Sequence, residues 1–224
     1  MVKKGDAVYP TGYEPKIKDE KSIENRQSLL NVILGDHSQE ISEDIDTDLF
    51  EVMKRRRSTR KFDSKPVEDW KVDKILAAAD TAPTAGNFQG FEVFYIKNEK
   101  LKEELVKAAN NQPYVNSPIV IVYCKNPSRV KLQFPDKMLK KFAIQDATLA
   151  AAYSQLAATA LSLSTIWIGM IDEKKVGDII GTDLVPSSIL CIGYPVKRKW
   201  SRQLRKQATL SKKSKAVLKF FFPF

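Results

Sequence analysis

The sequence lacks the residues that several common kinds of active site require. Its single histidine, His37, lies in a polar stretch where we expect a surface residue, which leaves none for a Ser-His-Asp triad or a multi-histidine metal site. The two cysteines, Cys124 and Cys191, lie in apolar runs typical of strands, which favours inert core thiols over a disulfide or a metal pair. The nine glycines include no Gly-x-Gly, and no Gly-Lys-Ser or Gly-Lys-Thr occurs, so the dinucleotide fingerprint and the P-loop are absent. Redox chemistry would therefore need a bound cofactor.

Long apolar runs are missing as well. No run approaches the ~18 apolar residues of a membrane span. Residues 1–6 lead into no apolar segment of the kind that a signal peptide contains, so we expect a cytoplasmic protein. The 224 residues, 43% hydrophobic and 29% charged, suit one sizeable globular domain with appendages.

The net charge of +10 is unevenly distributed. Ten of the 37 basic residues and no acidic residue lie between Val196 and Phe224, which leaves 27 basic against 27 acidic residues in the rest of the chain. A nucleic-acid partner would therefore have to bind the tail rather than the fold, and we expect none.

The densest cluster of functional groups is Arg55-Arg56-Arg57-Ser58-Thr59-Arg60. Residues 48–54, just before it, predict a short amphipathic helix with Asp48 and Glu51 as an N-terminal capping pair. The planar donor fork of arginine suits phosphate oxygens, and the hydroxyls add donors. The cluster is either a cradle for one phosphate monoester or a solvated basic helix end that complements the helix dipole.

Apolar periodicity predicts the remaining elements of the chain. The predicted helices are 67–79, 100–109, 146–163 and 174–180. The predicted strands are 91–96, 119–124 and 188–195, the last ending in a turn, and 165–170 leads into a turn. The helix over 146–163 is rich in alanine and hydrophobic all round, which predicts burial in the core or at a subunit interface. Residues 84–90 form a loop with side-chain amides. A phosphate cradle beside such a loop suits flavin mononucleotide (FMN), which has one phosphate and an amide-like pyrimidine edge.

Ordered motifs resemble the nitroreductase family of flavoproteins over residues 48–196. They are residues 56–62, 66–67, 82–89, 116–118, 146–151, 167–169 and 192–195. The resemblance implies an α+β fold, a nitroreductase-like α/β/α sandwich with a central mixed sheet, assembled as an intertwined homodimer with two FMN molecules at the interface. Residues 1–47 are then a polar N-terminal extension, 48–196 the FMN-binding domain, and 197–224 a basic C-terminal tail with a Phe-rich end.

The resemblance also implies roles for individual residues. No side chain is given a catalytic role and no metal is expected, because the flavin carries the chemistry. The phosphate would be held by Arg56, Ser58 and Arg60, with Arg57 and a late arginine, Arg202 or Arg205, as further candidates. The other subunit would contact the flavin through Pro83, Thr84, Ala85, Asn87 and Gln89. The backbone N–H groups of Ile168 and Gly169 would lie near the flavin N5 and O4, and Gln112 near its polar edge.

The function that the resemblance implies is an FMN-dependent oxidoreductase. Hydride would pass from NADH or NADPH through flavin N5 to a small aromatic, nitro, quinone or enone acceptor by a ping-pong mechanism. The alternatives are a flavin-binding carrier or sensor without rapid turnover, or a dehalogenating member of the same family. For the tail we expect an arm that crosses the partner subunit; a peripheral membrane contact is the competing interpretation.

Two motifs depart from the family pattern. Gly90-Phe91 stands where the family often has Pro-Trp, and Ser162-Leu163-Ser164 stands where it often has Gly-Leu-Gly. A serine in the left-handed position after a helix costs roughly 1 kcal/mol relative to glycine, so we expect the long helix to end differently.

Overall fold

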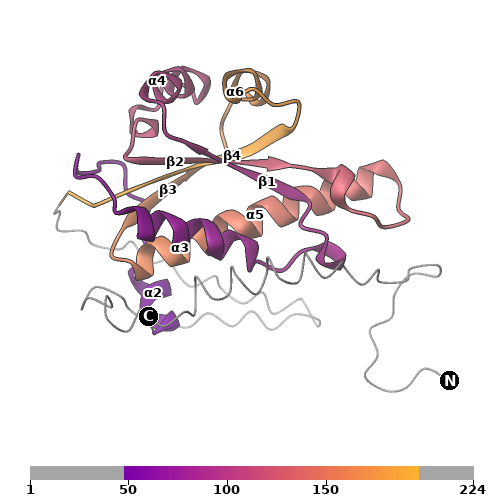
Figure 1. Ribbon diagram of the computed structural model, residues 1–224, viewed down its shortest axis with the longest axis horizontal. Helices are drawn as coiled ribbons and strands as arrows, with labels where there is room; N and C mark the ends of the chain where they lie inside the picture. Colours follow the sequence, from indigo (N-terminus) through magenta and orange to yellow (C-terminus); the bar gives the residue numbers. More distant parts are fainter. Residues whose placement is uncertain (1–47, 197–224) are drawn as a thin grey trace, which may run out of the picture.

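The computed structural model describes residues 48–196 (Figure 1). The predicted N-terminal extension and basic tail lie outside the described residues. Four strands form one sheet in the order β1-β2-β4-β3, and every neighbouring pair is antiparallel. The strands are β1 (Phe91–Ile96), β2 (Ile119–Lys125), β3 (Ser164–Ile168) and β4 (Val185–Gly193). The predicted strands are therefore present, with β2 and β4 in the centre and β1 and β3 at the two edges.

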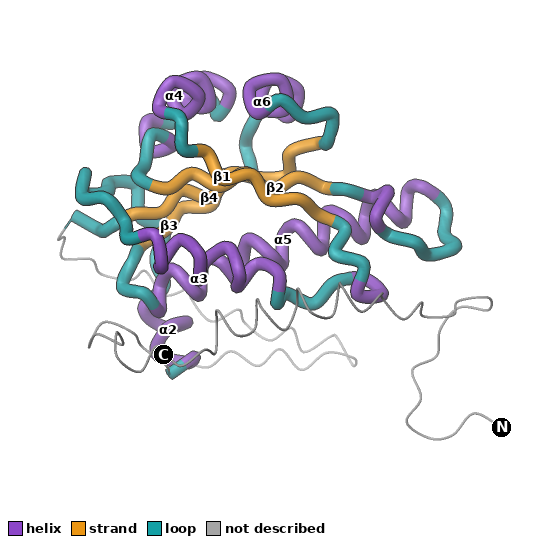
Figure 2. Tube along the Cα trace, viewed as in Figure 1, coloured by secondary structure: helices purple, strands orange, loops and turns teal. Residues whose placement is uncertain are grey.

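Helices cover both faces of this sheet, as Figures 1 and 2 show. One face carries α3 (Asp69–Asp80) and α5 (Asp136–Ala160), and the other carries α4 (Glu99–Ala108) and α6 (Glu173–Ile180). Successive side chains of a strand point to opposite faces. Central strand β2 therefore supplies Ile119, Ile121 and Tyr123 to one core cluster, and Val120, Val122 and Cys124 to the other. The three-layer α+β sandwich is confirmed.

The mixed character that we expected of the sheet is confined to one contact. Among the described residues, the parallel pairing is an isolated bridge between Ser58 and Thr165. The named strands themselves pair only in antiparallel fashion.

Helix α5 begins ten residues before the predicted start, because Asp136 to Gln145 continues the helix with a mostly solvated surface. The alanine-rich part does not expose an apolar surface all round. Ala147, Ala150 and Ala151 are fully buried in the core of the same chain. Of the two predicted alternatives, burial in the core is the one that holds for these alanines, because their methyl groups pack within the chain itself.

The end of α5 also differs from expectation. Ser162 adopts the left-handed conformation that the family's glycine would favour, with φ 59°. Its N–H donates to Thr159 O over 3.1 Å, and the N–H of Leu163 donates to Ala158 O over 2.9 Å. This pair of bonds is the Schellman arrangement. Leu163 is buried in the same core cluster as Ala158, and that burial helps to offset the strain at Ser162.

Candidate functional site

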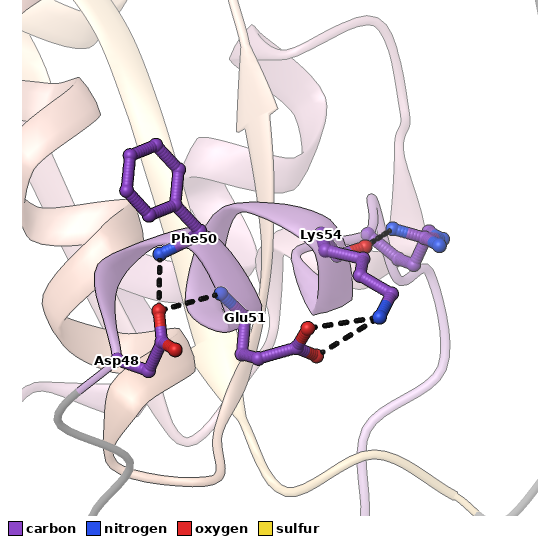
Figure 3. A network of polar contacts seen from close by, with 5 residues as sticks. Asp48, Phe50, Glu51 and Lys54 are labelled. Atoms are coloured by element: carbon purple, nitrogen blue, oxygen red, sulfur yellow. Dashed lines mark hydrogen bonds and ion pairs between the residues drawn. The ribbon is translucent and has the colours of Figure 1, made fainter. Parts of the chain in front are cut away.

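The arginine run begins at the end of helix α2 (Leu49–Arg55). Asp48 caps this helix as predicted: its Oδ1 accepts from the N–H groups of Phe50 (2.9 Å) and Glu51 (3.3 Å) (Figure 3). Glu51 also pairs with Lys54 at 2.8 Å. Arg56 leaves the helix with extended backbone angles, φ −51° and ψ 126°. The Asp48 cap fixes the start of α2, and the extended backbone of Arg56 fixes the direction in which the chain continues from Arg57.

The run then lies along the outer edge of β3. Ser58 forms the parallel bridge with Thr165, and the N–H of Thr59 donates to Thr165 O over 2.8 Å. Because β3 is an edge strand of the described sheet, this backbone takes the place that a further strand would occupy.

The arginines of the run have different surroundings. Arg57 Nη1 donates to the carbonyl oxygens of Lys54 and Arg56 and so caps the end of α2. Arg55 Nη2 lies 3.5 Å from Thr159 O. The side chains of Arg56 and Arg60 form no hydrogen bond or ion pair within residues 48–196, and Ser58 and Arg60 are exposed. Arg56, Ser58 and Arg60 thus remain available for an anion, whereas Arg57 has a structural partner.

The other end of β3 carries the predicted Ile168-Gly169 pair. Ile168 is buried, whereas Gly169 is exposed, and a Cβ built at Gly169 would meet no atom within 4 Å. Thr165 and Ile168 are three residues apart on the strand, a distance of about 10 Å at the usual rise. The arginine run and an open backbone segment at Gly169 therefore lie at the two ends of the same edge strand.

Gln112 lies against this segment. Its Nε2 donates to Ala109 O over 2.8 Å and lies 3.5 Å from Met170 O, and its Oε1 accepts from the hydroxyl of Tyr114. Gln112 thus lies beside Met170, with its amide engaged by protein groups, and its contact with a flavin stays a prediction.

The loop of residues 83–89 precedes β1 and is held in an unusual conformation. Gly86, Asn87 and Gln89 all have left-handed backbone angles, with φ of 56°, 60° and 49°. The N–H of Gln89 donates to Thr84 Oγ1 over 3.1 Å, and Gln89 Nε2 donates to Asn87 Oδ1 over 2.6 Å. These contacts close the loop on itself, and Pro83 and Asn87 remain exposed.

Asp146 on α5 connects this loop to the core. Its Oδ1 accepts from the N–H of Ala85 and its Oδ2 from the N–H of Gly90, both over 3.0 Å. Burial raises the pKa of Asp146, and the two backbone N–H groups oppose that rise. In the sequence, Asp146 marks the predicted start of a helix and opens a family motif without a role of its own; an acidic residue among alanines was the signal of a further role.

The loop and the arginine run lie at opposite edges of the sheet. The loop leads into β1, and the run pairs with β3. Three inter-strand spacings separate these edges, about 14 Å. One chain therefore does not bring the two groups of predicted residues together. Arg202 and Arg205 lie outside the described residues.

Arg60 also borders a cleft of about 750 Å³ at the end of the sheet. Lys102 and Glu99 of α4 line the cleft, and Lys102 Nζ donates to Glu99 Oε1 over 2.8 Å and to Pro118 O over 3.2 Å. Lys102 is almost fully buried and its charge is paired with Glu99, and Asp63 also lines the cleft beside Arg60 and Lys61, so the lining has an excess of one positive charge.

The two buried cysteines and the spacing of the possible metal ligands limit the chemistry of the site. Cys124 and Cys191 are free and buried, and burial raises the pKa of each thiol to about 12, so both are inert as predicted. Within residues 48–196, no cluster of three or more histidine, cysteine or acidic side chains could hold a metal ion.

In the same range, none of the helices combines the length and apolar character needed to span a membrane.

Comparison with known proteins agrees with this architecture. The sequence profile of the nitroreductase family matches residues 53–118 and 108–194. A Methanothermobacter thermautotrophicus protein, named as an NADH dehydrogenase/NAD(P)H nitroreductase, is 29% identical over 167 residues, which cover 70% of this chain and 82% of the relative. An FMN reductase of Bacillus subtilis that uses NAD(P)H is 26% identical over 158 residues, covering 63% of this chain and 64% of the relative.

Solved structures share the fold. A B. subtilis nitroreductase superposes with a TM-score of 0.65 at 24% identity and covers 76% of each chain. The NADPH:FMN oxidoreductase of Vibrio harveyi, solved with NAD+, gives a TM-score of 0.62 at 22% identity over 72% of this chain and 80% of its own. Because the family profile spans more than half of the 224 residues, the chain belongs to the nitroreductase family.

Proposed function

We propose that the protein is an FMN-dependent oxidoreductase that takes hydride from NADH or NADPH and delivers it to a small acceptor. The observation that carries the proposal is edge strand β3, with free cations beside one end and an open backbone segment at the other. The names of its relatives support the same activity, since they include an NAD(P)H nitroreductase and FMN reductases. The acceptor class that we propose is aromatic nitro compounds, quinones or enones, reduced in a ping-pong cycle.

The described residues fit the cofactor. Arg56, Ser58 and Arg60 would hold the phosphate, because their donors have no competing side-chain partner in the described chain. Charge-assisted bonds of this kind are the strong ones. The distance of about 10 Å along β3 suits a ribityl chain between the phosphate and the ring. At the far end, the absence of a side chain at Gly169 leaves room for a flat ring against the backbone.

Each part of the chain then has a limited task, because FMN supplies the hydride chemistry when bound. The backbone N–H group of Gly169 would donate to the ring and stabilise negative charge on it, whereas Ile168 is paired with Ile189 of β4 and would hold Gly169 in position. Trp167 and Met170, with 40% and 72% of their surfaces exposed, lie on either side of this pair and would form an apolar rim for the acceptor. Gln112 would hold the segment through Met170 O rather than contact the ring directly.

We infer that the complete site belongs to a homodimer. The loop of residues 83–89 would contact the FMN whose phosphate is held by the partner subunit's arginine run, since the two lie at opposite edges of one chain's sheet. The chain also exposes apolar side chains on the outer surfaces of α2 and α5 that a second copy would cover: Leu49, Phe50, Met53, Ile144, Leu149 and Tyr153.

The test of the function is the absorption spectrum of the purified protein before and after anaerobic addition of NADH or NADPH. We expect flavin absorbance that is lost quickly on reduction and returns when a nitroaromatic or a quinone is added. A flavin spectrum that neither nucleotide reduces would indicate a carrier or sensor instead. Protein that remains colourless after incubation with FMN would contradict the proposal altogether.

A further inference from the structure

The carboxylate of Asp146 binds both ends of one loop. Its two oxygens each accept one backbone N–H, from Ala85 and from Gly90, at 3.0 Å. Only 2% of Asp146 is exposed, so water does not compete for these bonds. A buried carboxylate is costly unless its oxygens are hydrogen-bonded, and here the loop backbone supplies that compensation. Asp146 and the loop therefore hold each other in place.

The loop between these two bonds would not keep its shape without support. Asn87 and Gln89 adopt left-handed angles in which their Cβ atoms are strained, and Gly86 has the same backbone conformation. Such residues persist only where the surroundings determine them. Inside the loop, the bond from Gln89 N–H to Thr84 Oγ1 closes the turn. The two bonds to Asp146 attach the loop to helix α5 at both of its ends.

Gly90 explains why the second bond can form in this chain. The family often has proline at this position, and proline carries no N–H to donate. Gly90 supplies that N–H, and its lack of a side chain is also required: a Cβ there would lie 2.7 Å from Val130 Cγ2 and 3.0 Å from Asp146 Oδ2. The departure from the family pattern at Gly90 thus creates a two-point attachment of the loop.

We propose that Asp146 is a positioning residue that presets loop 84–90 in its cofactor-binding conformation before the cofactor arrives. This inference rests on the proposed function, because it takes the loop as a contact of the flavin. A preset loop raises the fraction of protein that is competent to bind, and both the affinity and the association rate depend on that fraction.

The variant that tests this role is Asp146→Asn. Asparagine has nearly the same volume but only one acceptor oxygen, so it can accept one of the two N–H groups and must face the other with its own NH₂ donors. The matched control is Asp136→Asn, which removes the same charge from an exposed position in the first turn of the same helix.

Hydrogen exchange in the FMN-free protein gives the first measurement. In Asp146→Asn we expect faster exchange in peptides that contain the amides of Ala85 and Gly90, with unchanged exchange in β2 and in the rest of α5. Asp136→Asn should exchange like the wild type throughout. Unchanged loop exchange in Asp146→Asn, or a general loss of protection in the core, would overturn the proposal.

Stopped-flow binding gives the second measurement. We expect the association rate of FMN to fall by about tenfold in Asp146→Asn, while the dissociation rate changes by less than about twofold, because the loop must order first. Riboflavin, which lacks the phosphate, should slow by the same factor. Equal association rates in mutant and wild type would overturn the role of Asp146 and leave the proposed function intact, whereas a wild type that binds no flavin would overturn both.

Discussion

The hydroxyl of Tyr194 donates a hydrogen bond to Oε2 of Glu68 over 2.6 Å. The same hydroxyl accepts from the buried Nζ of Lys71 over 2.8 Å, and Lys71 lies 3.5 Å from Glu68. Tyr194 follows β4, whereas Glu68 and Lys71 mark the start of α3. The backbone carbonyl oxygen of Tyr194 also accepts a hydrogen bond from the N–H of Asp63 over 2.8 Å. Together, these contacts of Tyr194 join α3, the end of β4 and the segment that follows the arginine run.

The first prediction concerns the pH dependence of this contact. The hydrogen bond from Tyr194 is the main cause that lowers the pKa of Glu68 from 4.5 to about 2, and Lys71 adds to it. Because the folded pKa is depressed, the ionised carboxylate contributes stability above about pH 4.5 that is lost as the pH falls toward 2. Glu68→Gln should therefore lower the free energy of unfolding near neutral pH, and its difference from the wild type should vanish by about pH 2.

Urea unfolding at several pH values measures the difference in the free energy of unfolding between Glu68→Gln and the wild type. Glu103→Gln, at an exposed position on α4, is the control and should give a small difference that does not depend on pH. A pH-independent difference for Glu68→Gln would show that the carboxylate contributes through packing and not through its charge. Burial alone lowers the pKa of Lys71, but the bond with Tyr194 and the charge of Glu68 outweigh it, so Lys71 stays charged throughout this range.

The second prediction concerns the phosphate. Each charge-assisted bond contributes roughly 1.5–3 kcal/mol, so Arg56→Ala should weaken FMN binding by about ten- to a hundredfold. Riboflavin binding should change much less, because riboflavin has no phosphate. Arg129→Ala, which removes a guanidinium that pairs with Glu92, is the control and should bind both flavins normally. Equal losses for FMN and riboflavin would contradict the assignment of Arg56.

The third prediction concerns the shared site and uses mixed dimers of Arg56→Ala and Asn87→Ala subunits. If the arginine run of one subunit meets the loop of the other, a mixed dimer has one site with both changes and one site with neither. FMN binding by equilibrium dialysis should then recover to about one FMN per mixed dimer. If both groups served the same site from one subunit, each site would carry one change and binding would not recover.

The fourth prediction concerns the end of α5. Ser162 has φ 59°, where a side chain costs about 1 kcal/mol or more and glycine costs almost nothing. Ser162→Gly should therefore raise the free energy of unfolding by about 0.5–1 kcal/mol, after allowance for the greater freedom of glycine in the unfolded chain. Ser162→Ala keeps the Cβ and should give no such gain. A Ser162→Gly protein with an unchanged or lower urea midpoint would contradict this account of the strain.

Local sequence was sufficient for much of the fold. The alternation and length of the apolar runs predicted β1 and β2, and the Asp48 cap with the apolar period predicted α2. The start of α5 was missed because residues 136–145 form a mostly solvated helix, which an apolar pattern indicates only weakly. The pairing of Ser58 with Thr165 could not be predicted by the same means, since it joins residues that are distant in the chain and depends on the edge position of β3.

The candidate site shows the same limit. The arginine run was identifiable by composition, and the family resemblance already placed Arg57 behind Arg56 and Arg60. Only the structure gives the physical reason, because the Arg57 guanidinium binds the end of α2. Likewise, the motif that contains Asp146 was recognised without a role, because the partners of its carboxylate lie more than fifty residues away in the sequence.

The placement of the loop and the arginine run at opposite edges of the sheet has a consequence for how the protein would behave on dilution. If each cofactor needs groups from two chains, cofactor binding and subunit association are linked equilibria, and each must strengthen the other. The fraction of protein that retains its colour would then fall with protein concentration, even at constant excess FMN. Conversely, added FMN would shift the monomer–dimer equilibrium toward the dimer, so that cofactor supply would set the assembly state as well as the activity.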